Sequence, residues 1–186
     1  MEKYNMYSLS DICEFNKFSY SSTDNWDFIN YLDTSNITEN KIDEIQFLNF
    51  EVDKVPSRAK RKVQIDDIVY STVRPNQKHF GIIKEKVDNF LVSTGFTVIS
   101  VKEKINADFL YYYLTQNHII EALHNIAEQS TSAYPSIKSS DIGNIEVSLP
   151  ELSIQEKIAK ILNSIENKVQ LNEKINHNLI FESTKT

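Results

Sequence analysis

Residues 149–162 read LPELSIQEKIAKIL, and this stretch separates two kinds of sequence. Before it, Ile145 to Leu149 carries β-forming residues and predicts a last strand, which Pro150 ends. After it, Ser153 and Glu156 have the spacing of a capping box, in which each side chain accepts a hydrogen bond from a backbone NH of the first helical turn. We therefore predict that a strand passes through the proline directly into a helix that begins at this box.

The predicted C-terminal helix keeps an apolar face for about 28 residues without glycine or proline, and at about 1.5 Å per residue it would be about 42 Å long. This face consists of Ile154, Ile158, Ile161, Leu162, Ile165, Val169, Ile175 and Leu179. Asn172 stands within it, as a buried asparagine does when it fixes the register of a coiled coil. The helix either folds back on its own domain or forms an arm that needs a partner helix; its length favours the arm.

The sequence before the proline predicts a domain made mostly of sheet. Strand-forming runs occur at residues 28–38 (ending in a polar loop), 45–52, 68–73, 80–83, 96–101 and 145–149. From Ala107 the apolar period changes to three and four residues, which predicts one or two helices capped by Asn106. We expect an α+β fold, with a mixed or antiparallel-sheet domain over residues 1–150 and a long coiled-coil helix over residues 151–186.

Composition excludes several classes of protein. With 186 residues, 40% of them hydrophobic, and only 3 glycines and 4 prolines, the chain is expected to be a soluble globular protein rather than a disordered or collagen-like one. The N-terminal residues lack the apolar core of a signal peptide, and no run approaches the length of a membrane span. Cys13 is the single cysteine, so we expect neither an intramolecular disulfide nor a thiolate zinc site, which fits a reducing cytoplasm.

The charge is distributed unevenly along the chain. The net charge of −6 argues by itself against a protein that coats nucleic acid. However, residues 54–84 hold eight basic and two acidic side chains, whereas residues 1–53 hold three basic and eleven acidic ones. Because charges within about 10 Å act together, a basic island of this kind is typical of a bounded docking site for a polyanion. A solvated loop is the simpler alternative.

Motifs for catalysis are absent from the sequence. The isolated glycines Gly81, Gly95 and Gly143 cannot form a loop that binds phosphate or a cofactor, and no histidine pair has a metal-ligand spacing. We expect a binding module without a cofactor or metal of its own. The polar stretch 129–141 is long enough to carry recognition, whereas the tyrosines at 111–113 point in different directions on a helix and are expected to serve packing.

Five stretches of the sequence carry a more specific pattern. They are WDFINYLDTSNIT (26–38), PSRAKRKVQIDDIVYSTVRPNQKHFGII (56–83), LVSTGFTVI (91–99), FLYYYLTQ (109–116) and SAYPSIKSSDIGNIEVSLPELSIQEKIAKIL (132–162). Together they resemble the target recognition domain and following conserved helix of type I restriction-modification specificity subunits. The turn STVRPNQ and the junction LPELSIQEKIAKIL resemble the family most strongly. The chain departs from it at Asp66, where relatives usually have glycine, and at Glu151, where they often have a second proline.

The resemblance implies a division of labour between subunits. A complete subunit of that family holds two recognition domains separated by two long antiparallel helices, and each domain reads one half of a split DNA sequence. This chain resembles one half, so two copies would pair through their arms and read an inverted repeat in double-stranded DNA. A modification methyltransferase subunit would supply S-adenosylmethionine and adenine methylation, and a restriction or translocase subunit could join. An arm of about 42 Å and a DNA repeat of about 34 Å predict half-sites between one and two turns apart.

Candidate DNA contacts come from the basic island and the polar stretch. The predicted phosphate contacts are Lys60, Arg61, Lys62, Lys78 and Lys84. The predicted base or groove contacts are Arg58, Arg74, Asn76, Gln77, His79, Ser132, Tyr134 and Lys138. For Arg74 the alternative is a structural role in the turn that follows the strand at 68–73.

Two other functions are compatible with the sequence. The chain could be an enzyme with an unfamiliar site. It could also be a scaffold or anti-restriction protein that binds a methyltransferase through the arm without reading DNA. Sequence-dependent adenine methylation in the presence of the partner subunit separates these alternatives from a specificity subunit.

Overall fold

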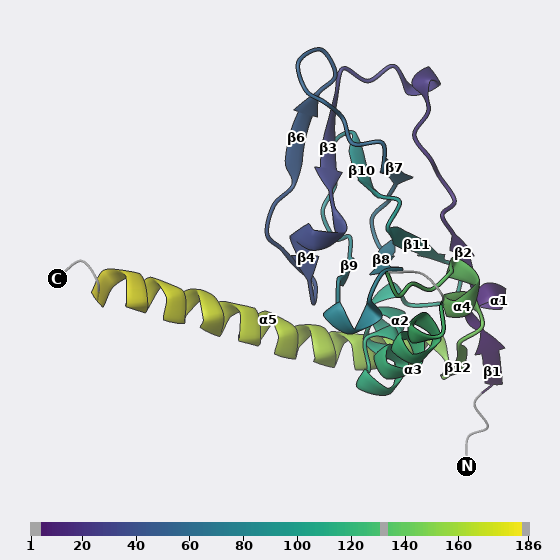
Figure 1. Cartoon of the computed structure of the whole chain (residues 1–186). Helices are drawn as coiled ribbons and strands as arrows, with labels where there is room; N and C mark the ends of the chain where they lie inside the picture. Colours follow the sequence, from purple (N-terminus) through teal and green to yellow (C-terminus); the bar gives the residue numbers. More distant parts are fainter. Residues whose placement is uncertain (1–4, 131–133, 184–186) are drawn as a thin grey trace.

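The computed structural model describes residues 5–130 and 134–183, with side chains described as far as residue 176 of the C-terminal helix. A domain with two four-stranded sheets carries one long helix, which starts at the base of the domain and projects away from it (Figure 1). This architecture confirms the predicted α+β fold.

The first sheet has the strand order β6-β3-β10-β7. Its strands are β3 (Phe28–Leu32), β6 (Gln46–Asn49), β7 (Ala59–Lys62) and β10 (Phe90–Ser93). The central pair β3 and β10 is parallel, and the outer pairs are antiparallel, so the sheet is mixed. The edge strand β7 carries three of the basic residues of the island.

The second sheet is antiparallel, with the strand order β2-β11-β8-β9. Its strands are β2 (Cys13–Phe15), β8 (Ile68–Ser71), β9 (Phe80–Ile82) and β11 (Phe96–Val101). Because successive side chains of a strand point to opposite faces, Val69 packs in a cluster with side chains of the first sheet, whereas Ile68 and Tyr70 pack toward the helices. Both faces of β8 are therefore covered, which explains its continuous apolar sequence.

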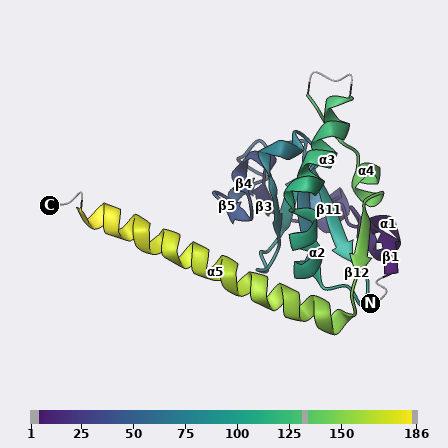
Figure 2. The same cartoon turned by 90° about the horizontal axis from the view of Figure 1, so that it is seen from below.

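Helices cover the outer face of the second sheet. They are α1 (Leu9–Ile12), α2 (Ala107–Leu114), α3 (Asn117–Glu128) and α4 (Ser139–Gly143), whereas α5 (Leu152–Ser183) is the long projecting helix. Figure 2 shows α2 and α3 beside the sheet that contains β11, with α5 running away from the domain. Asn106 caps α2 as predicted, since its side chain accepts a hydrogen bond from the NH of Phe109 at 2.9 Å.

Shorter elements complete the domain. A strand β1 (Asn5–Ser8) pairs with β12 (Glu146–Leu149), and β4 (Ile37–Thr38) pairs with β5 (Lys41–Ile42). Three 3₁₀ turns are η1 (Ser22–Asp24), η2 (Thr34–Asn36) and η3 (Pro75–Gln77). The strand-forming runs recognised in the sequence correspond to β3, β6, β8, β9, β11 and β12, and the run at residues 28–38 also reaches β4. The sequence did not predict β7, in which basic residues dominate, and it did not predict β1, β2, β5 or β10 either.

The departure at Asp66 lies at a position with unusual backbone geometry. Asp66 has a φ of 70°, in the left-handed region that glycine adopts without strain and that aspartate tolerates better than most residues. Its carboxylate also forms an ion pair with Lys84 at 2.7 Å. The backbone therefore explains why glycine suits this position and why aspartate is accepted there.

The start of α5 differs from the sequence prediction. The helix begins at Leu152, and the carbonyl of Glu151 accepts hydrogen bonds from the NH groups of Ile154 and Gln155 at 2.8 and 3.1 Å. Ser153 lies inside the first turn, so the predicted capping box at this serine is wrong. The buried Gln155 instead fixes the start of the helix, because its amide accepts from the NH of Asn106 and donates to the carbonyl of Pro150, both at 2.9 Å.

Asp67 is a buried carboxylate in the turn before β8. It is only 4% exposed and accepts hydrogen bonds from the NH of Gln64 at 2.7 Å and the hydroxyl of Ser100 at 2.6 Å. Burial raises its pKa above the ordinary value of 3.8 despite these hydrogen bonds. The folded state therefore holds this proton more tightly than the unfolded chain, and the contribution of Asp67 to stability falls as pH rises from below 3.8 through the folded pKa.

Asp67→Asn is expected to remove this decline, because the amide can still accept from Gln64 and can donate to Ser100 without burying a charge. The melting temperature of the variant should gain on that of the native chain as pH rises through this window, and the gain should persist at pH 7. Thermal unfolding followed by circular dichroism between pH 3 and 8 measures the difference. A constant difference across this range would contradict the assigned pKa.

Candidate nucleic-acid interface

Four segments that are distant in sequence meet at one surface beside the edge of the first sheet. The turn after β8 contacts the β10–β11 turn, since Thr72 donates to the carbonyl of Gly95 through its NH at 2.8 Å and its hydroxyl at 2.9 Å. The β10–β11 turn in turn contacts the approach to β7, where the NH of Thr94 donates to the carbonyl of Arg58 at 2.8 Å. We call segments 58–61, 72–77, 94–95 and 134–138 the basic surface.

The fourth segment of the basic surface belongs to the polar stretch predicted for recognition. The NH of Arg74 donates to the carbonyl of Pro135 at 3.0 Å, and the NH of Ile137 donates to the carbonyl of Thr72 at 2.8 Å. The guanidinium of Arg74 lies over the ring of Tyr134, 5.8 Å from its centroid, and the tyrosine is 65% exposed. The fold thus brings the island and the polar stretch together, as a shared recognition surface requires.

Gly95 makes room for the side chain of Arg58. A Cβ at Gly95 would lie 2.4 Å from Nη2 of Arg58 and 2.9 Å from Cγ2 of Thr34, so only glycine allows this approach. Burial would raise the pKa of Asp33, but hydrogen bonds from Tyr31 and Thr34, together with the charge of Arg58, lower it overall. An ionised Asp33 therefore lies near the exposed Arg58 and orients this end of the surface.

The three basic residues of β7 have different surroundings. Lys60 is exposed and forms no ion pair with another described residue. Arg61 is partly buried: its Nη2 donates to the carbonyl of Thr94 at 3.3 Å, and burial lowers its pKa. Its Nε and Nη1 are buried without a partner among the described residues, so they reach an outside acceptor only if the side chain turns outward.

Lys62 has partners within the domain. It forms an ion pair with Asp24 and lies over the ring of Trp26, 5.1 Å from the centroid. Arg61, the preceding residue of the strand, points to the opposite face of the sheet, because successive side chains of a strand alternate between faces. The basic run is thus divided between two faces, and a phosphate contact by Lys62 would require the loss of its ion pair.

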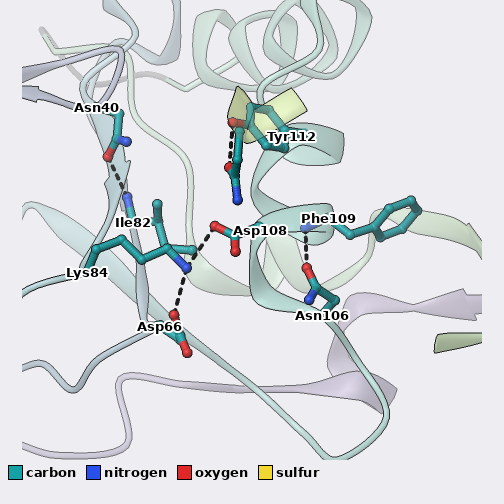
Figure 3. Close-up of polar contacts among 9 residues, drawn as sticks. Asn40, Asp66, Ile82, Lys84, Asn106, Asp108, Phe109 and Tyr112 are labelled. Atoms are coloured by element: carbon teal, nitrogen blue, oxygen red, sulfur yellow. Dashed lines mark hydrogen bonds and ion pairs between the residues drawn. The ribbon is translucent and has the colours of Figure 1, made fainter. Parts of the chain in front are cut away.

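Three further predicted contacts are also held by the domain. Lys78 forms an ion pair with Glu39 at 2.6 Å, and Nδ1 of His79 is hydrogen bonded to the carbonyl of Ile37 at 2.7 Å. Lys84 lies between the carboxylates of Asp66 and Asp108, at 2.7 Å from each (Figure 3). Apart from Asp66, these partners come from outside the basic island, so the charge pattern of the island could not reveal them.

The remaining described candidates are exposed at the surface of the domain. Asn76 and Gln77 are exposed on η3, and Lys138 is exposed before α4. Ser132 lies outside the described residues. Arg58, Lys60, Arg74, Asn76, Gln77, Tyr134 and Lys138 therefore remain the accessible members of the predicted set. Thr94 and Gly95 join them on the basic surface, although the candidate DNA contacts predicted from the sequence did not include them.

The long helix presents two different faces. Its polar face contacts the domain: the hydroxyl of Tyr112 donates to the amide oxygen of Asn163 at 2.7 Å, and Lys41 forms an ion pair with Glu173 at 2.6 Å. Buried Tyr111 and the hydrogen-bonded Tyr112 and Tyr113 confirm that the tyrosine triplet serves packing. Tyr112, Lys84 and Asn163 of α5 line one groove. Figure 3 shows the side chains of Tyr112 and Lys84.

The predicted apolar face of α5 points away from the domain. Ile158, Ile161, Ile165, Val169 and Ile175 are 37–61% exposed, and Asn172 is exposed among them. Ile154 and Leu162 are partly buried, and the side chain of Leu179 lies outside the described residues. The helix therefore contacts its own domain through polar groups and the buried Ala159, while most of its predicted apolar face is uncovered among the described residues.

The described residues show neither a membrane-spanning helix nor a cluster of metal ligands. No helix among them is long and apolar enough to cross a membrane. Within residues 5–130 and the described part that follows, no group of three or more His, Cys, Asp or Glu side chains is arranged to hold a metal ion.

Comparisons with known proteins identify a matching family and related proteins. Residues 1–179 match the family described as type I restriction modification DNA specificity domain. The chain is 31% identical over 185 residues to the type I restriction enzyme HindI specificity subunit of Haemophilus influenzae, covering 96% of this chain and 39% of that protein.

Solved structures share the fold. The HsdS subunit from Thermoanaerobacter tengcongensis superimposes with a TM-score of 0.77 at 23% identity, over 94% of this chain and 45% of that one. The type I restriction-modification S subunit from M. genitalium gives a TM-score of 0.56 at 17% identity, over 93% and 41% of the two chains. The chain spans less than half the length of these relatives. It belongs to the family of type I restriction modification DNA specificity domains.

Proposed function

We propose that this chain is a half-length specificity subunit that dimerises, reads a bipartite inverted repeat in double-stranded DNA and directs adenine methylation by partner subunits. The basic surface is the observation that carries this proposal. It gathers accessible Arg58, Lys60, Arg74 and Lys138 in an otherwise acidic chain, on segments that no local sequence pattern brings together.

The accessible residues suit both tasks of a DNA reader. Lys60 and Lys138 carry flexible ammonium groups that neutralise phosphates and set the register on the duplex. Arg58 and Arg74 can donate two hydrogen bonds to guanine, and Asn76 or Gln77 can pair with adenine in the same manner. The position of Arg74 over Tyr134 limits its freedom, which lowers the entropy lost on binding a base.

The exposed apolar face of α5 supports the dimer. Exposed isoleucines at helical spacing gain free energy when a second amphipathic helix covers them. Two identical readers joined by a two-fold axis bind an inverted repeat, because each half-site then meets the same side chains. The length of the arm sets half-sites between one and two DNA turns apart, that is, about 34 to 68 Å.

In this proposal the chain performs no catalysis. A modification methyltransferase subunit binds S-adenosylmethionine and transfers the methyl group, and a restriction or translocase subunit joins the same cytoplasmic complex. The chain supplies the DNA address.

The decisive experiment is a methylation assay with the modification methyltransferase subunit and radiolabelled S-adenosylmethionine. We expect adenine methylation of a defined inverted repeat only when this chain is added, and none when the chain or its recognition sequence is omitted. Sequencing of methylated adenines on genomic DNA identifies the repeat. Methylation that does not depend on sequence, or does not need the chain, would refute the proposal.

The alternative of a scaffold or anti-restriction protein gives a different result in the same assay. Such a protein would bind the methyltransferase through α5 and leave methylation unchanged or reduced. Electrophoretic mobility shift with random duplexes at low salt adds a second distinction, since a scaffold without a DNA-reading role would show no salt-dependent binding.

A further inference from the structure

The exposed face of α5 contains a regular seam with two polar members. Starting at Ile158 and advancing by alternating steps of three and four residues, the seam consists of Ile158, Ile161, Ile165, Lys168, Asn172 and Ile175. All six residues are exposed. This spacing is the a and d pattern of a two-stranded coiled coil, in which Lys168 takes a d position and Asn172 an a position.

Two further apolar side chains flank the seam. Val169 and Leu171 are 45% and 57% exposed, and they lie on opposite sides of the seam at the e and g positions. α5 contacts its own domain through a different face, which includes Asn163 and Glu173. Val169 and Leu171 are therefore not needed for that contact. A partner helix that covers the seam must also pack against these two side chains.

A parallel pair would place Lys168 opposite Lys168 of the second copy, two like charges in the seam, and this disfavours the parallel orientation. An antiparallel pair brings each a position opposite a d position of the second copy, so the polar members select among the possible registers. In one register Asn172 faces Lys168 of the second copy, twice, and Ile165 faces Ile175, twice. Displacing one helix by a heptad in either direction places Asn172 opposite Ile161 or Ile175. Each displaced register therefore buries four polar groups against apolar ones, which costs free energy that the matched register avoids.

We propose that two copies of this chain pair along α5 with the two-fold axis at the level of Gln170. This inference rests on the homodimer of the proposed function and specifies how it is built. The amide oxygen of Asn172 accepts a hydrogen bond from the ammonium of Lys168 of the second copy on both sides of the axis. Val169 packs against its own counterpart on one flank of the seam, and Leu171 packs against its own counterpart on the other.

The register fixes the separation of the two domains. Leu152, the first residue of α5, lies 18 positions before residue 170, so the two helix starts are about 54 Å apart at about 1.5 Å per residue. This distance is between one and two DNA turns of about 34 Å, the range required for half-sites read by one dimer. The polar pair thus sets the spacer length as well as the pairing.

Single cysteines test the register in the full-length chain. The native Cys13 is 3% exposed, and burial raises its pKa to about 12, so it does not compete for thiol reagents at neutral pH. A cysteine at position 171 lies about 3 Å along the axis from its own copy in the proposed register, whereas one at position 164 lies about 18 Å from its copy. Both positions are exposed and occupy the same g flank, which makes Ser164→Cys the matched control for Leu171→Cys.

With a short bis-maleimide, Leu171→Cys is expected to form covalent dimers at least about tenfold faster than Ser164→Cys, because a fixed register raises the local thiol concentration. Val169→Cys should behave like Leu171→Cys and provides a second variant on the other flank. Faster cross-linking at position 164, or equally slow reaction at all three positions in a dimeric protein, would overturn the register.

Two measurements separate the register from the proposed function. Asn172→Cys forms a disulfide readily in a parallel pair, where each a position faces itself, and should not do so in the antiparallel one. Its rapid disulfide formation would overturn the antiparallel register while leaving a dimer in place. Sedimentation of the native chain as a strict monomer at high concentration would instead overturn the homodimer itself, and with it the register, without bearing on DNA contacts by the basic surface.

Discussion

Ile165→Asp is expected to raise the dissociation constant of the homodimer by about 1,000-fold. Ile165 is 53% exposed in the single chain, and in the proposed dimer it would occupy two layers, one on each side of the two-fold axis. Each layer would lose a buried aliphatic side chain and gain a desolvated carboxylate, and a loss of about 2 kcal/mol per layer corresponds to about 1,000-fold in affinity. Sedimentation equilibrium over a range of concentrations measures the change.

Asn167→Asp is the matched control for this prediction. It introduces the same charge two residues further along α5, at an exposed position outside the seam. The control should remain dimeric, and both variants should keep the circular dichroism spectrum of the native chain, because neither residue belongs to the core. Equal weakening by the two substitutions would show that general charge, rather than the apolar seam, governs association.

Arg58→Glu combined with Lys60→Glu is expected to weaken DNA binding by roughly 100-fold near physiological salt, because two cations that face phosphates or bases become repulsive. The slope of log affinity against log salt should also fall by about 2 if both residues contact phosphates. Fluorescence anisotropy with a labelled duplex at several salt concentrations measures both quantities. Neither residue is buried, so the fold should be retained.

The matched control for this pair is Lys86→Glu combined with Lys174→Glu. These residues are exposed, lie outside the basic surface and undergo the same reversal of charge. They should change DNA affinity only through net charge, by a small factor that is lost at higher salt. If the two double variants weaken binding to the same extent, the basic surface has no special role, and binding reflects the overall charge of the chain.

The sequence predicted those parts of the fold that depend on local patterns. Apolar runs such as IVYS at Ile68–Ser71 identified buried strands, and the change to helical periodicity at Ala107 located the helices. The AKRK strand at Ala59–Lys62 was missed because an edge strand needs only one apolar face and here carries basic residues instead. The capping box at Ser153 was wrong because the carbonyl of Glu151, two residues earlier, already starts the helix.

The candidate site was predicted less completely than the fold. The basic island and the polar stretch were both visible in the sequence, but their contact through Arg74 and Pro135 was not. The sequence also could not distinguish Lys60, which has no ion pair among the described residues, from Lys62, which forms an ion pair with Asp24. An ion pair across 38 residues depends on how strands and loops pack, and charge patterns along the chain carry no information on that.

By itself the sequence determined the two-part organisation, the family resemblance and the apolar face of the arm, because periodicity and junction residues are local properties. Only the tertiary structure decided which cations remain accessible and which face of α5 is left uncovered. The helix contacts its domain through Gln155, Asn163 and Glu173, whose polar side chains find specific partners there. That choice turns the isoleucines outward, where the proposed second helix can cover them.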